Sequence, residues 1–454
     1  MPDQPSTIGP SSVAAGAHGR APRGSSLVPY RWEMIGLLWV AFFLNQADRA
    51  VYNVVLPKLK LDLSLSDEQL GLVVLIFTWT YGVLVPIAGY AGDVLRRKWI
   101  ICGSLFFWSM TTVFTGVSNS LVQLMVFRGV STGGGEAFYY PAANSLIAQI
   151  HHKTRALAMG IHQTANYTGI IASGLIAGYI ADRWGWREAF YVFGGAGIVW
   201  SLLLLVRLKH TPPPGEQAPG EPAEHDAHPG HGALCAPAER IPLGVVLREV
   251  FRKPTVWALC LSFGGHQFVG IAYLTWMPTF LHEKFDLTLT NAGFSSMFYH
   301  HAAAMLGVLL GGRLSDLWSR NRYTARMETE AAGLLLGAPF VALMGLATNL
   351  WVCYAGLALF GLFRGVYDSN LFAAQFDVIA PRLRSSSVGI MLAFGFLVGA
   401  LGPYLLPFVK SRYDMSTAIA ALSAVYFGAG VVMLAARFLF FPRDYVRETP
   451  AESA

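Results

Sequence analysis

Long apolar runs separated by short polar connections dominate the chain. The runs are 19–27 residues long, enough for an α-helix to cross the hydrocarbon core of a bilayer, which takes about 17–25 residues. Continuous apolar runs favour helices, because the strands of a membrane barrel give short alternating segments instead. The pattern predicts an all-α membrane protein with twelve transmembrane helices, at 34–57, 69–91, 99–117, 120–145, 156–180, 188–207, 255–281, 291–313, 328–347, 349–373, 385–409 and 415–440.

One long polar stretch divides the predicted helices into two groups of six. It contains a run of three prolines and three histidines between His225 and His231. Such composition is typical of a flexible linker. The histidines allow a weak metal site, but a solvated loop is favoured. We expect a disordered tail, a six-helix bundle, a linker, a second six-helix bundle and a second tail, at 1–30, 31–207, 208–250, 251–440 and 441–454.

Composition and charge agree with a membrane protein. The chain is 54% hydrophobic and 13% charged, whereas soluble domains carry about 25% charged residues. Lys and Arg are concentrated in the tails, the linker and the connections on that same side, which places both termini in the cytoplasm. The net charge of +6 therefore gives no reason to expect nucleic-acid binding. Residues 1–30 lack the apolar core of a signal peptide. The four cysteines show no metal or disulfide spacing, and we expect neither a metal nor a cofactor.

Three predicted helices carry ionisable side chains of both signs. A charge at the centre of a bilayer costs at least about 2.5–3.5 kcal/mol on insertion scales, so intramembrane charges mark functional sites by default. Such a series favours a path for an ion or a charged solute. The residues are Asp48 and Arg49 in the first helix, Arg128 and Glu136 in the fourth, and Arg364 and Asp368 in the tenth.

The two groups of six helices repeat the same motifs. Phe-Arg-Gly-Val occurs at 127–130 and again at 363–366. A Gly-x-x-x-Asp loop with a following Arg occurs after the second and the eighth helix. Repeats at matched positions indicate duplicated architecture. Glycine allows two helices to approach at the membrane face, and Asp accepts N–H groups there. We interpret these as gating loops, formed by Gly89, Asp93 and Arg97 in the first half and Gly312, Asp316 and Arg320 in the second.

The Gly-x-x-x-Asp loop, repeated in both halves of a chain with six plus six predicted helices, resembles the loop motif of the major facilitator superfamily. The chain departs from the family pattern at Val94, where a basic residue is usual, and at Arg96, where glycine is usual. The resemblance implies two six-helix bundles that rock about a central cavity and give alternating access. It also implies a monomer.

Finer motifs resemble two groups within that family. Asn45-Gln-Ala-Asp48-Arg49 resembles the Asn-Tyr-x-Asp-Arg segment of the organic anion:cation symporters, such as hexuronate and galactonate transporters, and of the spinster lipid transporters. The segment from Arg128 to Ala137 resembles the Arg-x-x-x-Gly-x-Gly-Glu-Ala of both groups, with one extra residue before Glu136. Gly-Trp-Arg-x-x-Phe at 185–190 is similar to the anion symporters and favours them.

The resemblance assigns proton coupling to Asp48 and Glu136. Burial favours the protonated form of a carboxyl and a neighbouring Arg favours the ionised form, so such a group can exchange protons near neutrality. The alternative is a permanent ion pair that holds helices together. Arg49 offers a planar fork that matches a carboxylate; the alternative is that Asp48 or Glu136 neutralises it. We expect Arg128 and Asp368 to be charge partners.

Other intramembrane polar residues complete the predicted substrate site. Each one alone is more often a hydrogen bond between helices, and the set carries the interpretation. The predicted substrate-binding residues are Arg49, Tyr52, Tyr139, Tyr140, Asn144, His162, Gln163, Asn166, His266, Gln267, His300, His301, Arg364, Tyr367 and Asn370.

The sequence therefore predicts a secondary transporter rather than an enzyme. No phosphate-binding loop with Lys-Ser/Thr is present, so nucleotide hydrolysis is not the energy source. We expect symport of protons and a small organic anion, a sugar acid or other carboxylate, across the lipid bilayer. A spinster-like exporter of a lysolipid or other amphiphile is the first alternative. A sensor that binds a ligand without transporting it is the second.

Overall fold

The computed structural model describes residues 29–151, 154–209, 248–380 and 383–446, and every regular element in these ranges is a helix. The predicted tails, most of the linker and its histidine cluster lie outside the described residues. The elements of the N-terminal bundle are α1 (Tyr30–Asp62), α2 (Asp67–Val94), α3 (Arg97–Gly116), α4 (Leu121–Leu124), the π-helix η1 (Met125–Thr132), α5 (Gly133–Ala137), α6 (Tyr139–Ile150), α7 (Arg155–Arg183) and α8 (Trp186–Arg207).

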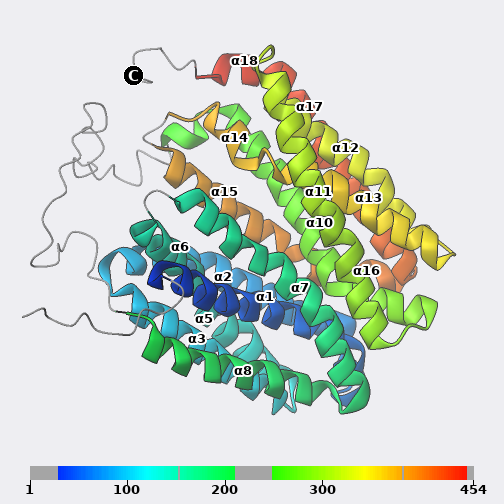
Figure 1. The fold of residues 1–454 in the computed structure, drawn as a ribbon. Coiled ribbons are helices and arrows are strands. Elements are labelled where there is room, and N and C mark those ends of the chain that lie inside the picture. Colours follow the sequence, from blue (N-terminus) through cyan, green and yellow to red (C-terminus); the bar gives the residue numbers. More distant parts are fainter. Residues whose placement is uncertain (1–28, 152–153, 210–247, 381–382, 447–454) are drawn as a thin grey trace, which may run out of the picture.

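The C-terminal bundle has the same layout (Figure 1). Each predicted span coincides with one helix or with consecutive helices that follow one another without a loop, which confirms the twelve-helix prediction. The elements of the C-terminal bundle are α10 (Pro254–Phe285), α11 (Leu289–Ser319), α12 (Ala325–Leu346), α13 (Leu350–Asp368), α14 (Leu371–Phe376), α15 (Arg384–Gly399), α16 (Leu401–Arg412), α17 (Met415–Leu439) and α18 (Phe441–Asp444).

Among the described residues, eight helices are long and apolar enough by composition to cross a membrane. The other four spans are α1, the segmented helix from α4 to α6, α7 and α11. They are less apolar because they carry polar side chains such as Arg49, Arg128, Asn166 and His300, all of which face the space between the bundles. All four line the cavity between the bundles, but α2, α10, α13 and α15, which pass the composition test, line it as well.

The bundles meet at one end of the molecule, where α1 ends and α2 begins, here called the sealed end. Gly71 of α2 lies directly against Pro403 of α16, and Gly178 of α7 lies against the backbone of Leu289 in α11. Polar contacts add to this seal. Asp182 accepts hydrogen bonds from the backbone N–H of Thr290 at 2.9 Å and from its hydroxyl at 2.7 Å.

A further ion pair joins the bundles at the sealed end, between Lys410 Nζ and Asp67 Oδ2 at 2.8 Å. At the other end, where α1 begins, three glycines of the interface helices face open space. Gly89 of α2, Gly160 of α7 and Gly389 of α15 have no atom within 4 Å of where a side chain would begin. Figure 1 shows the two sets of helices converging toward the lower right of the view. The structure is therefore closed at the sealed end and open toward the opposite one, the tail end.

Candidate functional site

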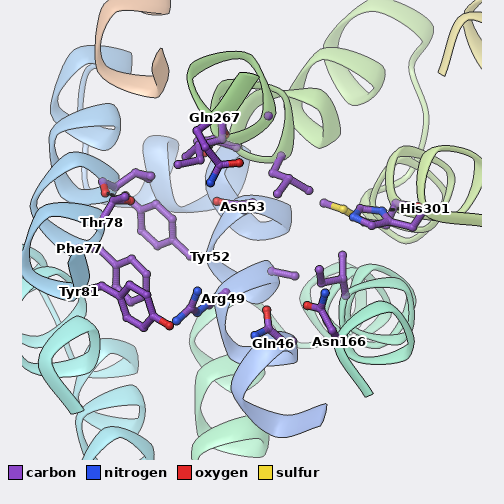
Figure 2. Close-up of a pocket in the computed structure, with 18 of the residues that line it drawn as sticks. Gln46, Arg49, Tyr52, Asn53, Phe77, Thr78, Tyr81, Asn166, Gln267 and His301 are labelled. Atoms are coloured by element: carbon purple, nitrogen blue, oxygen red, sulfur yellow. Dashed lines mark hydrogen bonds between the residues drawn. The ribbon is translucent and has the colours of Figure 1, made fainter. Parts of the chain in front are cut away.

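A cavity of about 390 Å³ lies between the two bundles. Both bundles supply its wall, and Figure 2 shows Arg49, Tyr81, Asn53, Asn166, Gln267 and His301 pointing into the same space. The wall combines aromatic rings with amides and three arginines. Its polar and aromatic residues are Phe42, Gln46, Arg49, Tyr52, Asn53, Phe77, Thr78, Tyr81, Arg128, Tyr140, Gln163, Asn166, Tyr167, Gln267, Thr275, His300, His301, Arg364, Asp368 and Phe396.

The ionisable residues of α1 and the fourth span form two interlocked ion pairs. Arg49 Nε lies 2.5 Å from Glu136 Oε2, and Arg128 Nη1 lies 2.9 Å from Asp48 Oδ2. Arg128 Nη1 also lies 4.0 Å from Glu136 Oε1, which links the pairs. The four residues thus form one charge cluster that is neutral when all are ionised.

The members of this charge cluster differ in their access to the cavity. The side chain of Arg49 is 24% exposed, whereas the side chains of Glu136, Asp48 and Arg128 are 0%, 4% and 4% exposed. Arg49 is held over the ring of Tyr81, with 4.2 Å between its guanidinium carbon and the ring centroid. Its Nε donates to Glu136, and its Nη2 is buried without a hydrogen-bond partner, so the guanidinium keeps an unused donor. Arg49 is therefore the cation that the cluster presents to a solute.

A π-helical segment explains how Arg128 and Glu136 face α1 together. They are eight positions apart, whereas the Arg and Glu of the motif that this segment resembles are seven positions apart. In a regular α-helix, at about 100° per residue, eight positions turn a side chain about 80° away from the first, whereas seven return it to the same face. The π-helix η1 (Met125–Thr132) contains Arg128 and takes up the extra residue. Both side chains consequently reach the same partner helix.

A second charged group lies on the wall of the C-terminal bundle. Arg364 Nε lies 3.7 Å from Asp368 Oδ2 one turn along α13, as the i, i+4 spacing predicts, and Nη1 lies 3.3 Å from His300 Nε2. Behind them, His266 Nε2 lies 3.2 Å from Asp368 Oδ1, and its Nδ1 lies 3.3 Å from the hydroxyl of Tyr426. Asp368 therefore connects the cavity to a buried histidine.

The predicted substrate residues fall into two groups. Arg49, Tyr52, Tyr140, Gln163, Asn166, Gln267, His300, His301 and Arg364 line the cavity. Tyr139, Asn144, His162, His266, Tyr367 and Asn370 do not line it. Tyr139 donates a hydrogen bond to the carbonyl of Leu38 at 2.6 Å, and His162 stacks on Phe42 with 4.7 Å between ring centroids. Asn370 accepts from Ser315 at 2.7 Å. These side chains hold helices together behind the wall.

The sequence analysis did not predict several residues of the cavity wall, because it relied on charged residues and α2 carries none within its apolar run. Phe77, Thr78 and Tyr81 all lie on one face of α2 and line the cavity, with both rings close to Arg49. Their spacing of three and four residues gave a signal, since aromatic residues at i and i+4 share a helical face. Gln46, Tyr167 and Thr275 were also missed.

The gating-loop residues lie at the tail end, on α2, α3 and α11. Arg97 donates from Nη1 to Gln149 Oε1 at 2.6 Å and to the carbonyl of Ser145 at 3.1 Å. The helix approach expected of Gly89 is made instead by Gly92, against Ala142 on α6. In the second half Gly311 lies against Val366, while Gly312 meets only Ser369. Asp93, Asp316 and Arg320 lie in or at the end of the same helices.

The Gly-Trp-Arg motif forms a corner at the sealed end. Gly185 has φ +122°, a conformation that favours glycine. Trp186 Nε1 donates to Asp62 Oδ2 at 3.1 Å, and Arg187 pairs with the same oxygen. The hydrogen bond from Arg187, with that from Trp186, holds the pKa of Asp62 below its usual range. The motif therefore joins the end of α1 to the start of α8.

Known proteins are similar to this chain in sequence and architecture. Residues 38–327 match the family model of the Major Facilitator Superfamily. The D-galactonate transporter of Escherichia coli is 26% identical over 410 residues, covering 87% of this chain and 93% of that one. The sodium-dependent phosphate transport protein 1 of Arabidopsis thaliana chloroplasts is 26% identical over 388 residues, covering 82% and 72%.

The chloroplastic ascorbate transporter of Arabidopsis thaliana is 24% identical over 409 residues, covering 88% of this chain and 73% of that one. A solved structure supports the same fold. The bacterial homolog of the human lysosomal transporter Spinster, in an inward-facing and unoccupied conformation, superposes with a TM-score of 0.79 at 22% identity, over 93% of this chain and 99% of that chain. The chain is an integral multi-pass membrane protein that belongs to the Major Facilitator Superfamily.

Proposed function

We propose that the protein is a secondary active transporter that moves a small organic anion together with protons. The observation that carries this proposal is the pair formed by Arg49 and Glu136. The cation of the pair faces the cavity, and its partner carboxylate is completely buried behind it. A solute anion can therefore reach the guanidinium, whereas Glu136 has no route to solvent in this conformation.

Anion and proton binding are linked at this pair. An incoming carboxylate competes with Glu136 for the N–H groups of Arg49, because both use the same guanidinium. Releasing Glu136 leaves a buried carboxylate without its main partner, which costs several kcal/mol. A proton on Glu136 removes that cost. The anion and the proton therefore stabilise each other's binding, which is the thermodynamic requirement for symport.

Asp48 supplies the second carboxyl of the mechanism. It is held by Arg128, which also approaches Glu136. We assign the proton-coupling role to both residues, with Glu136 binding its proton first.

The relatives favour an anionic substrate. D-galactonate, phosphate and ascorbate, which are named for three of them, are anions at neutral pH. A cavity of about 390 Å³ that combines Arg49 and Arg364 with amide and hydroxyl groups fits a sugar acid or another small polar carboxylate. The aromatic rings of Phe77 and Tyr81 give it one apolar wall.

The positive-inside rule orients the transporter. The tail end carries most of the connecting Lys and Arg residues, so we place it, and both termini, in the cytoplasm. The conformation described here is then the cytoplasm-open state, in which a monomer releases or takes up its solutes on the inner side. Breaking the contacts of the sealed end and closing the tail end completes alternating access.

The test is uptake of labelled organic acids into proteoliposomes, with and without an inward proton gradient. We expect one acid to accumulate only with the gradient. Glu136→Gln and Asp48→Asn should abolish that accumulation and retain exchange of internal for external acid, because both variants mimic the protonated carboxyl. Glu33→Gln is the control, since Glu33 pairs with Arg207 at the bundle surface.

Unchanged accumulation in the Glu136→Gln and Asp48→Asn variants would contradict the proposal. If no acid in the panel is taken up and a labelled lysolipid is transported, amphiphile export replaces the proposed anion symport.

A further inference from the structure

Glu330 is a buried carboxyl that the mechanism above does not use. Its side chain lies on α12 and is 0% exposed, and neither Oε1 nor Oε2 has a hydrogen-bond partner. One turn further along the same helix, Gly333 packs so closely on α13 that a Cβ there would lie 2.8 Å from backbone atoms of Phe363 and Tyr367. The carboxyl therefore lies inside the C-terminal bundle, against the helix that separates it from the cavity.

The charged surroundings of Glu330 do not stabilise an ionised carboxylate. The charged groups that act on it are Asp377 and Asp368, both acidic. Arg326, one turn earlier on α12, is paired with Asp377 at 2.6 Å. Glu328, two residues away, shows the contrasting arrangement: it lies 2.7 Å from Arg437 and 3.5 Å from Arg322.

The neutral form of Glu330 fits its neighbours. An ionised, unpaired carboxylate in a protein interior costs several kcal/mol and neutralises instead. A protonated carboxyl carries no charge that needs a partner, and the hydroxyl of Tyr367 on α13, which interacts electrostatically with Glu330, is likewise buried without a hydrogen-bond partner. The titratable and charged groups around the site are Arg326 on α12, Tyr367 and Asp368 on α13, Asp377 beyond α14 and Tyr426 on α17.

We propose that Glu330 is a second proton-binding site, which holds its proton in the cytoplasm-open conformation and exchanges it with the cavity past Asp368 during the transport cycle. Asp368 acts on Glu330 and also lines the cavity, with its side chain 32% exposed. α13 ends at Asp368 and α14 begins at Leu371, so the helix that separates Glu330 from the cavity is interrupted at this point. The bound proton follows from the structure of the bundle, and its exchange during transport rests on the proposed symport.

Infrared spectroscopy tests the bound proton without reference to transport. Neutral carboxyl groups have a C=O stretching band that carboxylates lack. In purified protein reconstituted in lipid at neutral pH, we expect Glu330→Gln to remove part of that band. Glu328→Gln should leave it unchanged, because Glu328 is ion-paired on the same helix. Glutamine reproduces the shape and hydrogen bonding of a neutral carboxyl, so Glu330→Gln should also fold and melt within a few degrees of the unmodified protein.

An undiminished band in Glu330→Gln would overturn the proposal, and so would failure of this variant to fold. The exchange step is tested by counting protons taken up per anion in proteoliposomes. We expect Glu330→Gln to lower that ratio by about one proton with unchanged anion affinity. A ratio equal to that of the unmodified protein would show a permanently neutral carboxyl and reject the exchange. If Glu330→Gln loses the band but uptake by the unmodified protein does not depend on the proton gradient, symport and proton exchange are rejected. The proton bound to Glu330 is then still supported.

Discussion

At the scale of single residues, the site depends on which side of an ion pair faces the cavity. Arg49 and Glu136 make the same contact as any buried pair, yet only the cation has access to a solute. The reverse arrangement would favour cations. Arg49 is therefore the residue where a change in side-chain geometry should affect substrate binding most directly.

Replacing Arg49 by lysine tests the role of the guanidinium fork. Lysine keeps the charge but cannot make two parallel hydrogen bonds to a carboxylate. Loss of one charge-assisted hydrogen bond costs about 1.5–3 kcal/mol, so we expect KM for the anion to rise by about 10- to 100-fold. Arg207→Lys, at the surface pair with Glu33, is the control. An unchanged KM in Arg49→Lys would show that Arg49 serves only to neutralise Glu136.

The sequence predicted which residues are charged but not how they pair. Asp48 and Arg49 are adjacent, so their side chains leave α1 in different directions, and their partners are 80 and 87 positions away. The crossed pairing depends on how the fourth span packs on α1. His266 was predicted to bind substrate, whereas it lies behind Asp368, because α10 is buried on most of its surface and composition gives no preferred face.

At the scale of elements, the apolar pattern was sufficient for the helices and insufficient for their interruptions. All twelve spans follow from run length alone. The π-helix η1 and the interruption between α13 and α14 leave composition unchanged and so leave no trace in hydropathy. The only signal of η1 was the extra residue between Arg128 and Glu136.

Deleting one residue from η1 tests its origin. Removal of Ser131 restores the seven-residue spacing, at which a regular α-helix places Arg128 and Glu136 on one face. We expect this variant to fold, to melt within a few degrees of the unmodified protein and to transport. Deletion of Ser109 from the regular helix α3 should abolish folding, because it rotates every later side chain by about 100°. Loss of folding in both variants would mean that the π-turn is itself required.

The packing of α11 on α13 depends on glycines that touch backbone. A Cβ at Gly365 would meet the carbonyl oxygen of Ala304, which a side-chain rotation cannot move. We expect Gly365→Ala to destabilise the protein by about 1–3 kcal/mol, measured as a lower melting temperature in detergent. Gly428→Ala on α17 is the control, because a Cβ there meets nothing within 4 Å. Equal melting temperatures for both variants would contradict this account of the interface.

At the scale of the whole molecule, the sealed end decides which conformation is populated. Asp182 of the N-terminal bundle accepts from the first N–H groups of α11 in the C-terminal bundle. A carboxylate at a helix N-terminus acts as a cap and complements the helix dipole. This contact joins the two bundles, so it stabilises the tail-open state relative to states in which the sealed end has separated.

Asp182→Ala should therefore shift the conformational equilibrium. Loss of a cap costs about 0.5–2 kcal/mol, which corresponds to roughly a 2- to 30-fold larger population of the state open at the sealed end. Spin labels at Leu61→Cys and Tyr413→Cys, both exposed there, would report it as a longer distance component. Glu33→Gln, which breaks a pair inside one bundle, should leave the distances unchanged. If the spin-label distances in Asp182→Ala equal those of the unmodified protein, packing alone keeps the sealed end closed.

The charges around the cavity have a further, electrical consequence. The wall and the layer directly behind it contain three arginines and three carboxylates, namely Arg49, Arg128, Arg364, Asp48, Glu136 and Asp368. Moving one elementary charge across 100 mV of membrane potential involves about 2.3 kcal/mol, but these six cancel. An empty carrier in which Glu330 keeps its proton should therefore return at a rate that is insensitive to membrane voltage, whereas one that returns with Glu330 ionised carries one negative charge and should be voltage-dependent. Any current recorded during uptake then measures directly the excess of protons over negative charges on the solute.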